Sequence, residues 1–222
     1  MNQEQWEARE ALRVQKEQQE RIEKLSILNQ YAGKGQILFT GSSLMEQFPV
    51  NEILMTKGLS YRIYNRGVSG FTTLDMLNHM DTMVFDLEPS RIFINIGTND
   101  IGATDYSEDA LLANYGRILT QIKERLPQAE VYVMAYYPVN ETDKLSRCEQ
   151  GAASFTNRNN KNIEAANQRI AGLAAEMGLH FIDVSDGLRD EHGRLKAEFT
   201  VEGIHMYANA YYVIFENMER YL

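Results

Sequence analysis

Short apolar runs alternate along the chain with longer segments of helical periodicity. Each run is rich in β-formers and ends in turn-forming residues. Near-continuous apolar runs of this length are typical of strands covered on both faces, as in parallel sheets. The five runs are QILFTG at 36–41, YRIYNRG at 61–67, RIFINIG at 91–97, EVYVMAYYP at 130–138 and HFIDVS at 180–185.

Helical patterns separate the later runs and close the chain, over 107–126, 157–178 and 207–222. Ser107 is a suitable N-cap for the first of them, and Gly178 is a natural residue to follow the second. Strands that alternate with helices predict βαβ units with right-handed crossovers. We therefore predict a three-layer α/β/α sandwich of flavodoxin-like type with a five-stranded parallel sheet.

The N-terminal segment differs from the rest, so we divide the chain into a helical arm at 1–32 and an α/β domain at 33–222. Residues 3–30 are rich in Glu, Gln, Lys, Arg and Ala, which favour helix, and have only a sparse apolar side. Two interpretations stay open: a solvated helix lying on the domain, or an arm that forms a homodimer. The arm offers no catalytic residue type, so we expect the chemistry to proceed without it.

Composition narrows the class of protein. With 222 residues, 44% of them hydrophobic and 24% charged, the chain suits one globular domain. A net charge of −9 argues against nucleic acid or an anionic membrane as partner. No apolar run approaches the length of about 18 residues that a membrane span needs. Together with the absence of a signal-peptide pattern, this predicts a cytoplasmic protein without a membrane span.

The number of cysteines and the spacing of potential metal ligands argue against disulfide and metal chemistry. The one cysteine, Cys148, cannot form an intrachain disulfide and lacks an activating context, so we interpret it as an ordinary thiol. No group of His, Cys, Asp and Glu has metal-ligand spacing, so we expect neither a metal nor a cofactor.

Small and polar residues follow the first three predicted strands, at 41–43, 65–70 and 97–100. Ligands of open α/β sheets bind outside the carboxyl ends of the strands, where these segments should meet. Acyl transfer from an ester requires a nucleophile, a base, a group that orients the base, and donors for the oxyanion. A serine at a strand-to-helix turn, a glycine and an asparagine supply the first and last of these.

Four segments in order resemble the sequence blocks of the SGNH hydrolases, also called the GDSL esterase/lipase family. They are GSSL at 41–44, NRGVSG at 65–70, GTND at 97–100 and VEGIH at 201–205, and the resemblance runs over 36–222. The resemblance implies Ser43 as nucleophile, His205 as base and Glu202 at the position of the acid. It also implies an oxyanion hole formed by Ser43, Gly70 and Asn99.

Two positions depart from the usual blocks. Ser42 replaces an aspartate beside the nucleophile, and we expect its hydroxyl to hydrogen-bond the turn. Glu202 replaces an aspartate three residues before the histidine. Its longer side chain leaves two alternatives: the carboxylate folds back to orient His205, or a backbone carbonyl does so. Asp100, next to Asn99, is expected to be a loop or cap residue rather than a catalytic acid.

The resemblance implies a serine esterase that hydrolyses a carboxylic ester through an acyl-enzyme. The sequences of the second and third blocks are similar to those of platelet-activating-factor-acetylhydrolase-like and lysophospholipase-like bacterial members of the family. The expected partner is a small-molecule ester with a small acyl, lipid or carbohydrate moiety. A non-catalytic ligand-binding module on the same fold is the alternative, because a fold alone does not imply catalysis.

Overall fold

The computed structural model describes residues 3–141 and 155–222, so Cys148 lies outside the described residues. Five parallel strands form one sheet in the order β2-β1-β3-β4-β5. The predicted flavodoxin-like sandwich is therefore confirmed. The strands are β1 (Ile37–Gly41), β2 (Ile63–Gly67), β3 (Arg91–Asn95), β4 (Glu130–Met134) and β5 (His180–Ile182).

The last three strands end earlier than the apolar runs that predict them. The runs continue to 97, 138 and 185, whereas the strands stop at Asn95, Met134 and Ile182. Buried apolar residues continue past the ends of these strands, for example Ile96 and Val184. The residues just after these strands are therefore apolar because they are buried, although they lie in loops beyond the last hydrogen bonds of the sheet.

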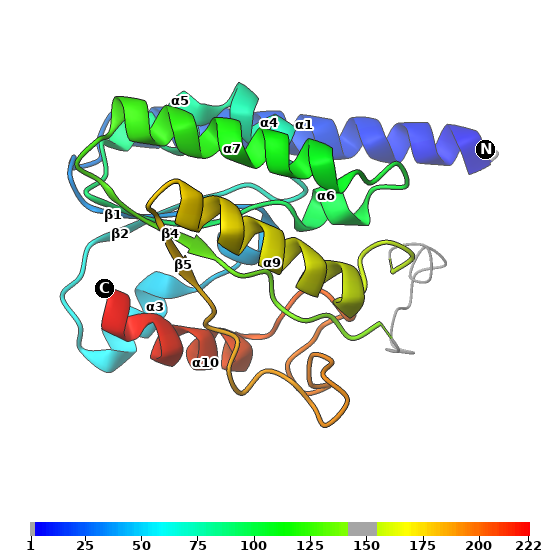
Figure 1. Cartoon of the computed structure of the whole chain (residues 1–222). Helices are drawn as coiled ribbons and strands as arrows, with labels where there is room; N and C mark the ends of the chain where they lie inside the picture. Colours follow the sequence, from blue (N-terminus) through cyan, green and yellow to red (C-terminus); the bar gives the residue numbers. More distant parts are fainter. Residues whose placement is uncertain (1–2, 142–154) are drawn as a thin grey trace.

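Helices cover both faces of the sheet (Figure 1). One layer contains α1 (Gln3–Asn29), α4 (Thr73–Asn78), α5 (Met80–Met83), α7 (Glu108–Arg125) and α9 (Asn160–Glu176). The other layer contains α3 (Val50–Lys57) and α10 (Ala208–Met218). The short helices are α2 (Ser43–Glu46) and α6 (Thr98–Gly102), with 3-10 turns η1 (Phe85–Leu87) and η2 (Glu219–Tyr221).

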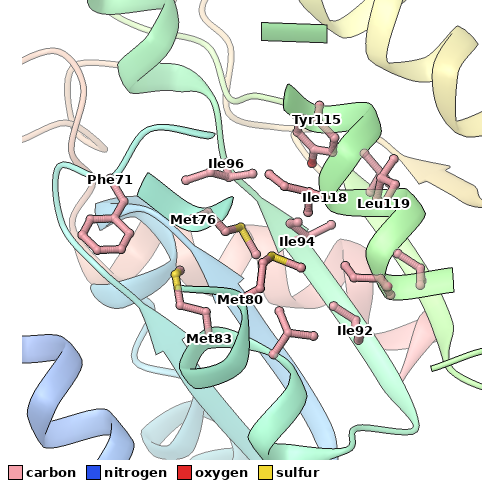
Figure 2. Close-up of a cluster of buried hydrophobic side chains, with 14 of the residues drawn as sticks. Phe71, Met76, Met80, Met83, Ile92, Ile94, Ile96, Tyr115, Ile118 and Leu119 are labelled. Atoms are coloured by element: carbon pink, nitrogen blue, oxygen red, sulfur yellow. The ribbon is translucent and has the colours of Figure 1, made fainter. Parts of the chain in front are cut away.

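Side chains of β3 alternate between two apolar clusters, one on each face of the sheet. Ile92 and Ile94 join the methionines of α4 and α5 and the aliphatic face of α7 (Figure 2). Phe93 points to the other face, where its ring lies 5.3 Å from that of Phe39. Because both faces are buried, the strand reads as a continuous apolar run in the sequence.

The predicted helix ends of α7 and α9 are confirmed. The hydroxyl of Ser107 accepts a hydrogen bond from the backbone N–H of Ala110 at 3.3 Å. After α9, Gly178 has a φ of +67°, and the N–H of Leu179 donates to the carbonyl of Ala174 at 2.8 Å. A left-handed residue at this position satisfies the last carbonyls of a helix, and glycine adopts it without steric cost.

Helix α1 lies on the domain through its C-terminal half. Ile22 and Leu25 are buried there, and the buried side chain of Asn29 accepts a hydrogen bond from Nε of Arg66 at 2.7 Å. The N-terminal end extends beyond the neighbouring helices (Figure 1), and Leu12 is 68% exposed. A homodimer through this helix stays a prediction. Within the described ranges, no helix is both long and apolar enough to cross a bilayer.

Candidate active site

The polar segments after β1, β2 and β3 meet at the carboxyl edge of the sheet and border a pocket of about 450 Å³. Ser43, Gly70, Asn99 and His205 all line this pocket, and Glu202 contacts His205 from behind. The structure thus brings together the five residues singled out from the sequence. The remaining lining residues are Val14, Glu17, Gln18, Arg21, Glu46, Gln47 and Ser69.

A glycine lets β1 turn directly into the helix that carries Ser43. A Cβ at Gly41 would lie 1.9 Å from the backbone oxygen of Asn95 on the neighbouring strand, so no side chain fits there. Ser43 is the first residue of α2. Helix geometry leaves its backbone N–H without an intrahelical acceptor, so this N–H can donate to a ligand. The side chain is 7% exposed.

The expectation for Ser42 is wrong in its detail. Its hydroxyl is buried, makes no cap hydrogen bond, and finds no partner among residues 3–141 and 155–222. The backbone of Ser42 holds the turn instead, because its carbonyl accepts from the N–H groups of Met45 and Glu46 at 3.1 and 2.9 Å. Of these two amides, the one of Met45 is the third of the helix, which a capping hydroxyl would otherwise satisfy.

Three side chains form one chain of hydrogen bonds. Nε2 of His205 lies 2.9 Å from Oγ of Ser43, and Nδ1 of His205 lies 2.6 Å from Oε1 of Glu202. The same carboxylate oxygen accepts the backbone N–H of His205 at 2.9 Å. The extra methylene of glutamate is accommodated because the side chain curls back over its own turn. Of the two alternatives for orienting His205, the structure has the carboxylate in contact.

The turn at 200–205 is held by two hydrogen bonds to one hydroxyl. Oγ1 of Thr200 accepts from the N–H of Gly203 at 2.6 Å and donates to the carbonyl of His205 at 3.1 Å. Gly203 has a φ of +99°, and a Cβ there would lie 2.6 Å from the backbone oxygen of Asn140. The turn is therefore fixed against the core rather than free in solvent, which orders the imidazole.

Opposing effects set the pKa of Glu202. Burial raises the pKa, whereas hydrogen bonds from the ring and backbone of His205 and the charges of His205 and Arg158 lower it, and the net shift is downward. A lowered pKa keeps this carboxylate ionised at neutral pH. An ionised carboxylate accepts the Nδ1–H bond and favours the tautomer in which Nε2 can take a proton.

Asn99 is held from both sides by contacts that the sequence does not reveal. Its Nδ2 donates to the carbonyl of Phe71 at 2.9 Å, and its Oδ1 accepts from Nη2 of Arg158 at 3.1 Å. Nε of Arg158 donates to the carbonyl of Thr98 at 2.9 Å. These contacts fix which end of the amide faces the pocket. Arg158 belongs to none of the four blocks, so motif reasoning missed it.

Asp100 has the expected capping role. Its carboxylate accepts the backbone N–H of Thr73 at 2.9 Å and the hydroxyl of the same residue at 2.5 Å. Burial raises the pKa of Asp100, and these hydrogen bonds oppose the shift. Thr73 is the first residue of α4, so Asp100 joins the third block to the helix that follows the second.

The N-terminal arm also lines the pocket, a position that its sequence did not lead us to expect. Val14, Glu17, Gln18 and Arg21 of α1 line the pocket. Their spacing of three, four and seven residues places them on one face of the helix. None was a triad candidate and no motif covers them, so no sequence signal marked this face. The contact arises only from the packing of α1 across the domain.

The other histidines do not line the pocket. The ring of His79 stacks on Phe71, that of His180 stacks on Tyr132, and His192 is exposed. Over residues 3–141 and 155–222, no three residues of the types His, Cys, Asp and Glu come together as metal ligands would. The pocket presents the serine, the histidine and the hydrogen-bond donors described above, with the carboxylate of Glu202 behind the histidine.

Comparison with known proteins places this geometry in a family. Residues 50–213 match the GDSL-like Lipase/Acylhydrolase family, a range that includes Gly70, Asn99, Glu202 and His205. Ser43 precedes that range, so structural comparison is needed to extend the match to it.

A structural neighbour that spans the whole chain covers the segment around Ser43 as well. A protein from Streptococcus pneumonia, described as a candidate platelet activating factor, is 31% identical with a TM-score of 0.87, covering 100% of this chain and 99% of its own. A GDSL-like lipase from Bacteroides thetaiotaomicron is 21% identical with a TM-score of 0.72, covering 90% of this chain and 96% of its own. The second likeness, at this identity, shows the fold alone.

One curated protein also matches: an N-acylneuraminate cytidylyltransferase from Escherichia coli, 22% identical over 188 residues, or 84% of this chain. The chain spans only 40% of the length of that relative. The family match covers most of the described domain, and the streptococcal protein matches over its full length. The chain therefore belongs to the GDSL-like Lipase/Acylhydrolase family, a family of ester-bond hydrolases.

Proposed function

We propose that this protein is a serine esterase that works through an acyl-enzyme. The observation that carries the proposal is the continuous chain from Ser43 through His205 to Glu202, with contacts of 2.9 and 2.6 Å. Membership of a family of ester-bond hydrolases supports the same reaction class.

Acylation begins when Oγ of Ser43 attacks the ester carbonyl carbon. Nε2 of His205 accepts the serine proton, and Glu202 holds the Nδ1–H and stabilises the imidazolium. The carbonyl oxygen gains a negative charge, which the backbone N–H groups of Ser43 and Gly70 and Nδ2 of Asn99 stabilise. Only one of the two hydrogens on Nδ2 is used by the carbonyl of Phe71, so the other is available for the substrate.

Collapse of the tetrahedral intermediate breaks the bond to the alcohol. His205 gives its proton to the departing alkoxide, which leaves as the neutral alcohol, and Ser43 keeps the acyl group. Water then loses a proton to His205 and attacks the acyl carbon through the same oxyanion site. The carboxylic acid is released and the proton returns to Ser43. The same three groups therefore serve both halves of the reaction.

The pocket lining favours a small acyl group and a polar alcohol. Val14 contributes the one aliphatic side chain among the described lining residues; the others are charged, polar or glycine. Burying each methylene of a fatty chain against apolar surface contributes about 0.8 kcal/mol, and Val14 is the one aliphatic side chain in this lining that such a chain could contact. Hydroxyl groups of a carbohydrate, in contrast, match the hydrogen-bonding side chains. We therefore place a short-chain ester of a polar alcohol ahead of a lipid ester.

Covalent labelling with a fluorophosphonate tests the chemistry. We expect modification at Ser43 in the folded protein, with Ser43→Ala unlabelled. Folded protein that is not labelled at Ser43 would refute the acyl-enzyme mechanism.

Hydrolysis of p-nitrophenyl esters from acetate to octanoate, beside a mono-O-acetylated methyl glycoside, tests the substrate class. We expect kcat/KM to be highest for the acetyl esters. A rise of about fourfold for each added methylene, the equivalent of 0.8 kcal/mol, would instead show an apolar acyl channel.

A further inference from the structure

The peptide group between Ser69 and Gly70 lies at the centre of a tight turn. The N–H of Phe71 donates to the carbonyl of Val68 at 3.2 Å, and Gly70 has a φ of +79°. Among the described residues only Glu88 combines a side chain with a positive φ, so Ser69 has a negative one. A negative φ followed by a positive φ in a hydrogen-bonded turn defines type II.

This turn can exist in two states that point the same peptide in opposite directions. Types I and II differ by a flip of the central peptide, which moves the residue after it between negative and positive φ. Glycine adopts both signs of φ about equally, so Gly70 itself does not decide between the states. The flip would reverse the N–H of Gly70, which is one of the proposed oxyanion donors. An external contact must therefore select the state.

Helix α1 supplies that contact. Nε2 of Gln18 donates to the carbonyl of Ser69 at 3.0 Å. The peptide bond is trans, so the carbonyl of Ser69 and the N–H of Gly70 point in opposite directions in one plane. With the carbonyl directed at α1, the N–H of Gly70 is directed away from it. Gly70 also lies directly beside this side chain, since a Cβ there would lie 2.7 Å from Nε2 of Gln18.

A second set of contacts holds the preceding residue and the helix together. Oε2 of Glu46 accepts both the N–H and the hydroxyl of Ser69, each at 2.6 Å. Oε1 of Glu46 lies 3.1 Å from Nε of Arg21 on α1. Glu46 belongs to α2, the helix that begins with Ser43. The turn that carries the Gly70 N–H is thus held to α2 on one side and to α1 on the other.

From these contacts we propose that Gln18 is a positioning residue for the oxyanion hole. It fixes the Ser69–Gly70 peptide in the type II orientation, so that the Gly70 N–H is already directed at the substrate oxygen when the ester binds. Arg21 supports the same turn through Glu46. The N-terminal helix is then part of the catalytic unit. This inference rests on the proposed esterase mechanism, because it gives the Gly70 N–H its role.

The test replaces Gln18 with residues of similar length that cannot donate. Gln18→Met removes the hydrogen bond, and Gln18→Glu also places a carboxylate against the carbonyl. A neutral hydrogen bond contributes about 0.5–1.5 kcal/mol, so we expect Gln18→Met to lower kcat for p-nitrophenyl acetate by about three- to tenfold. Gln18→Glu should lower it further, toward the loss of about 10²-fold that follows removal of a whole oxyanion donor.

Two readouts separate positioning from simple structural support or substrate contact. KM should change less than twofold, and the inhibition constant of a small trifluoromethyl ketone should rise in proportion to the fall in kcat/KM, because that inhibitor forms the tetrahedral oxyanion. Gln19→Met is the matched control: Gln19 lies on the same helix and bonds only Glu23 at 3.0 Å among the contacts described. We expect it to behave as the wild type.

The outcomes distinguish a failure of the role proposed for Gln18 from a failure of the proposed esterase mechanism. If the wild type is labelled at Ser43 but both Gln18 variants keep kcat within twofold, the positioning role is wrong. A raised KM with unchanged kcat would make Gln18 a substrate contact and would equally overturn the proposal. If the wild type is not labelled at Ser43, the proposed mechanism fails instead, whatever the Gln18 variants do.

Discussion

Glu202→Gln tests whether the charge of Glu202 supports His205, the proposed base. Both hydrogen bonds of Glu202 to His205 end on one oxygen, Oε1, at 2.6 Å from Nδ1 and 2.9 Å from the backbone N–H. A glutamine keeps an amide oxygen at that position, because turning its NH₂ group inward would set two donors against each other. The Nδ1–H tautomer is therefore preserved, and the variant loses charge rather than orientation.

The size of the effect follows from that distinction. A hydrogen bond to a charged group contributes about 1–1.5 kcal/mol more than a neutral one. Losing that difference sets a lower bound of about tenfold on the loss of kcat. The attraction between a carboxylate and an imidazolium about 4 Å apart is about 4 kcal/mol at an effective dielectric constant of 20, which gives an upper bound of about 10³-fold. Solvent reduces the upper bound, because the side chains of Glu202 and His205 are 35% and 33% exposed.

We therefore expect Glu202→Gln to lower kcat by about 10- to 10³-fold. This is less than the loss of about 10⁴-fold that accompanies the wrong tautomer in a serine protease triad. The assay is hydrolysis of p-nitrophenyl acetate at neutral pH, with circular dichroism to verify the fold. Glu191→Gln is the matched control, since Glu191 lies 3.6 Å from His192 on the surface, outside the pocket.

Two results would contradict the argument. A loss below about threefold would mean that the charge of Glu202 does not stabilise the imidazolium that forms on His205. A loss of about 10⁴-fold would match the cost of the wrong tautomer, so the shared oxygen would not protect the correct one.

Three further outcomes follow from the same contacts. Ser43→Ala should abolish ester hydrolysis, whereas Ser42→Ala should keep it and leave the melting temperature unchanged or higher, because the hydroxyl removed is buried without a partner in the described part of the chain; the reverse pattern of activity would move the nucleophile by one position. Arg158→Met should lower kcat by about tenfold or more, since Oδ1 of Asn99 loses its donor and only the bond from Nδ2 to the carbonyl of Phe71 still holds the amide, and Arg158→Lys should restore only part of kcat; equal activity of all three proteins would show that Asn99 needs no support from Arg158. Because the pKa of Glu202 is lower in the folded state, ionised Glu202 stabilises the fold above its usual pKa of 4.5, and this contribution is lost as the pH falls through the lower folded value. In urea titrations, the difference in unfolding free energy between wild type and Glu202→Gln should therefore shrink below pH 4.5. A difference that stays constant with pH would contradict the lowered pKa.

The sequence by itself determined the architecture and the identities of the site residues. Apolar runs that alternate with helical periodicity define the strands, because strands buried on both faces consist mostly of apolar residues. Ser43, Gly70 and Asn99 were chosen on the resemblance of their segments to the blocks of a known family, and each segment follows a predicted strand, whose carboxyl end meets the others at one edge of the sheet. These features are local or topological, so they can be inferred without knowing how distant segments pack.

Only the tertiary structure decided how those residues are supported. The curled side chain of Glu202 depends on a turn that Gly203 packs against the core, and the orientation of Asn99 depends on Arg158, which is 59 residues away in sequence. The place of Gln18 beside Ser69 likewise depends on the docking of α1 across 51 residues of chain. Such contacts carry no periodicity and no motif. They arise when separate elements pack together, because hydrogen bonds between distant side chains depend on distance in space and leave no mark on the order of the residues.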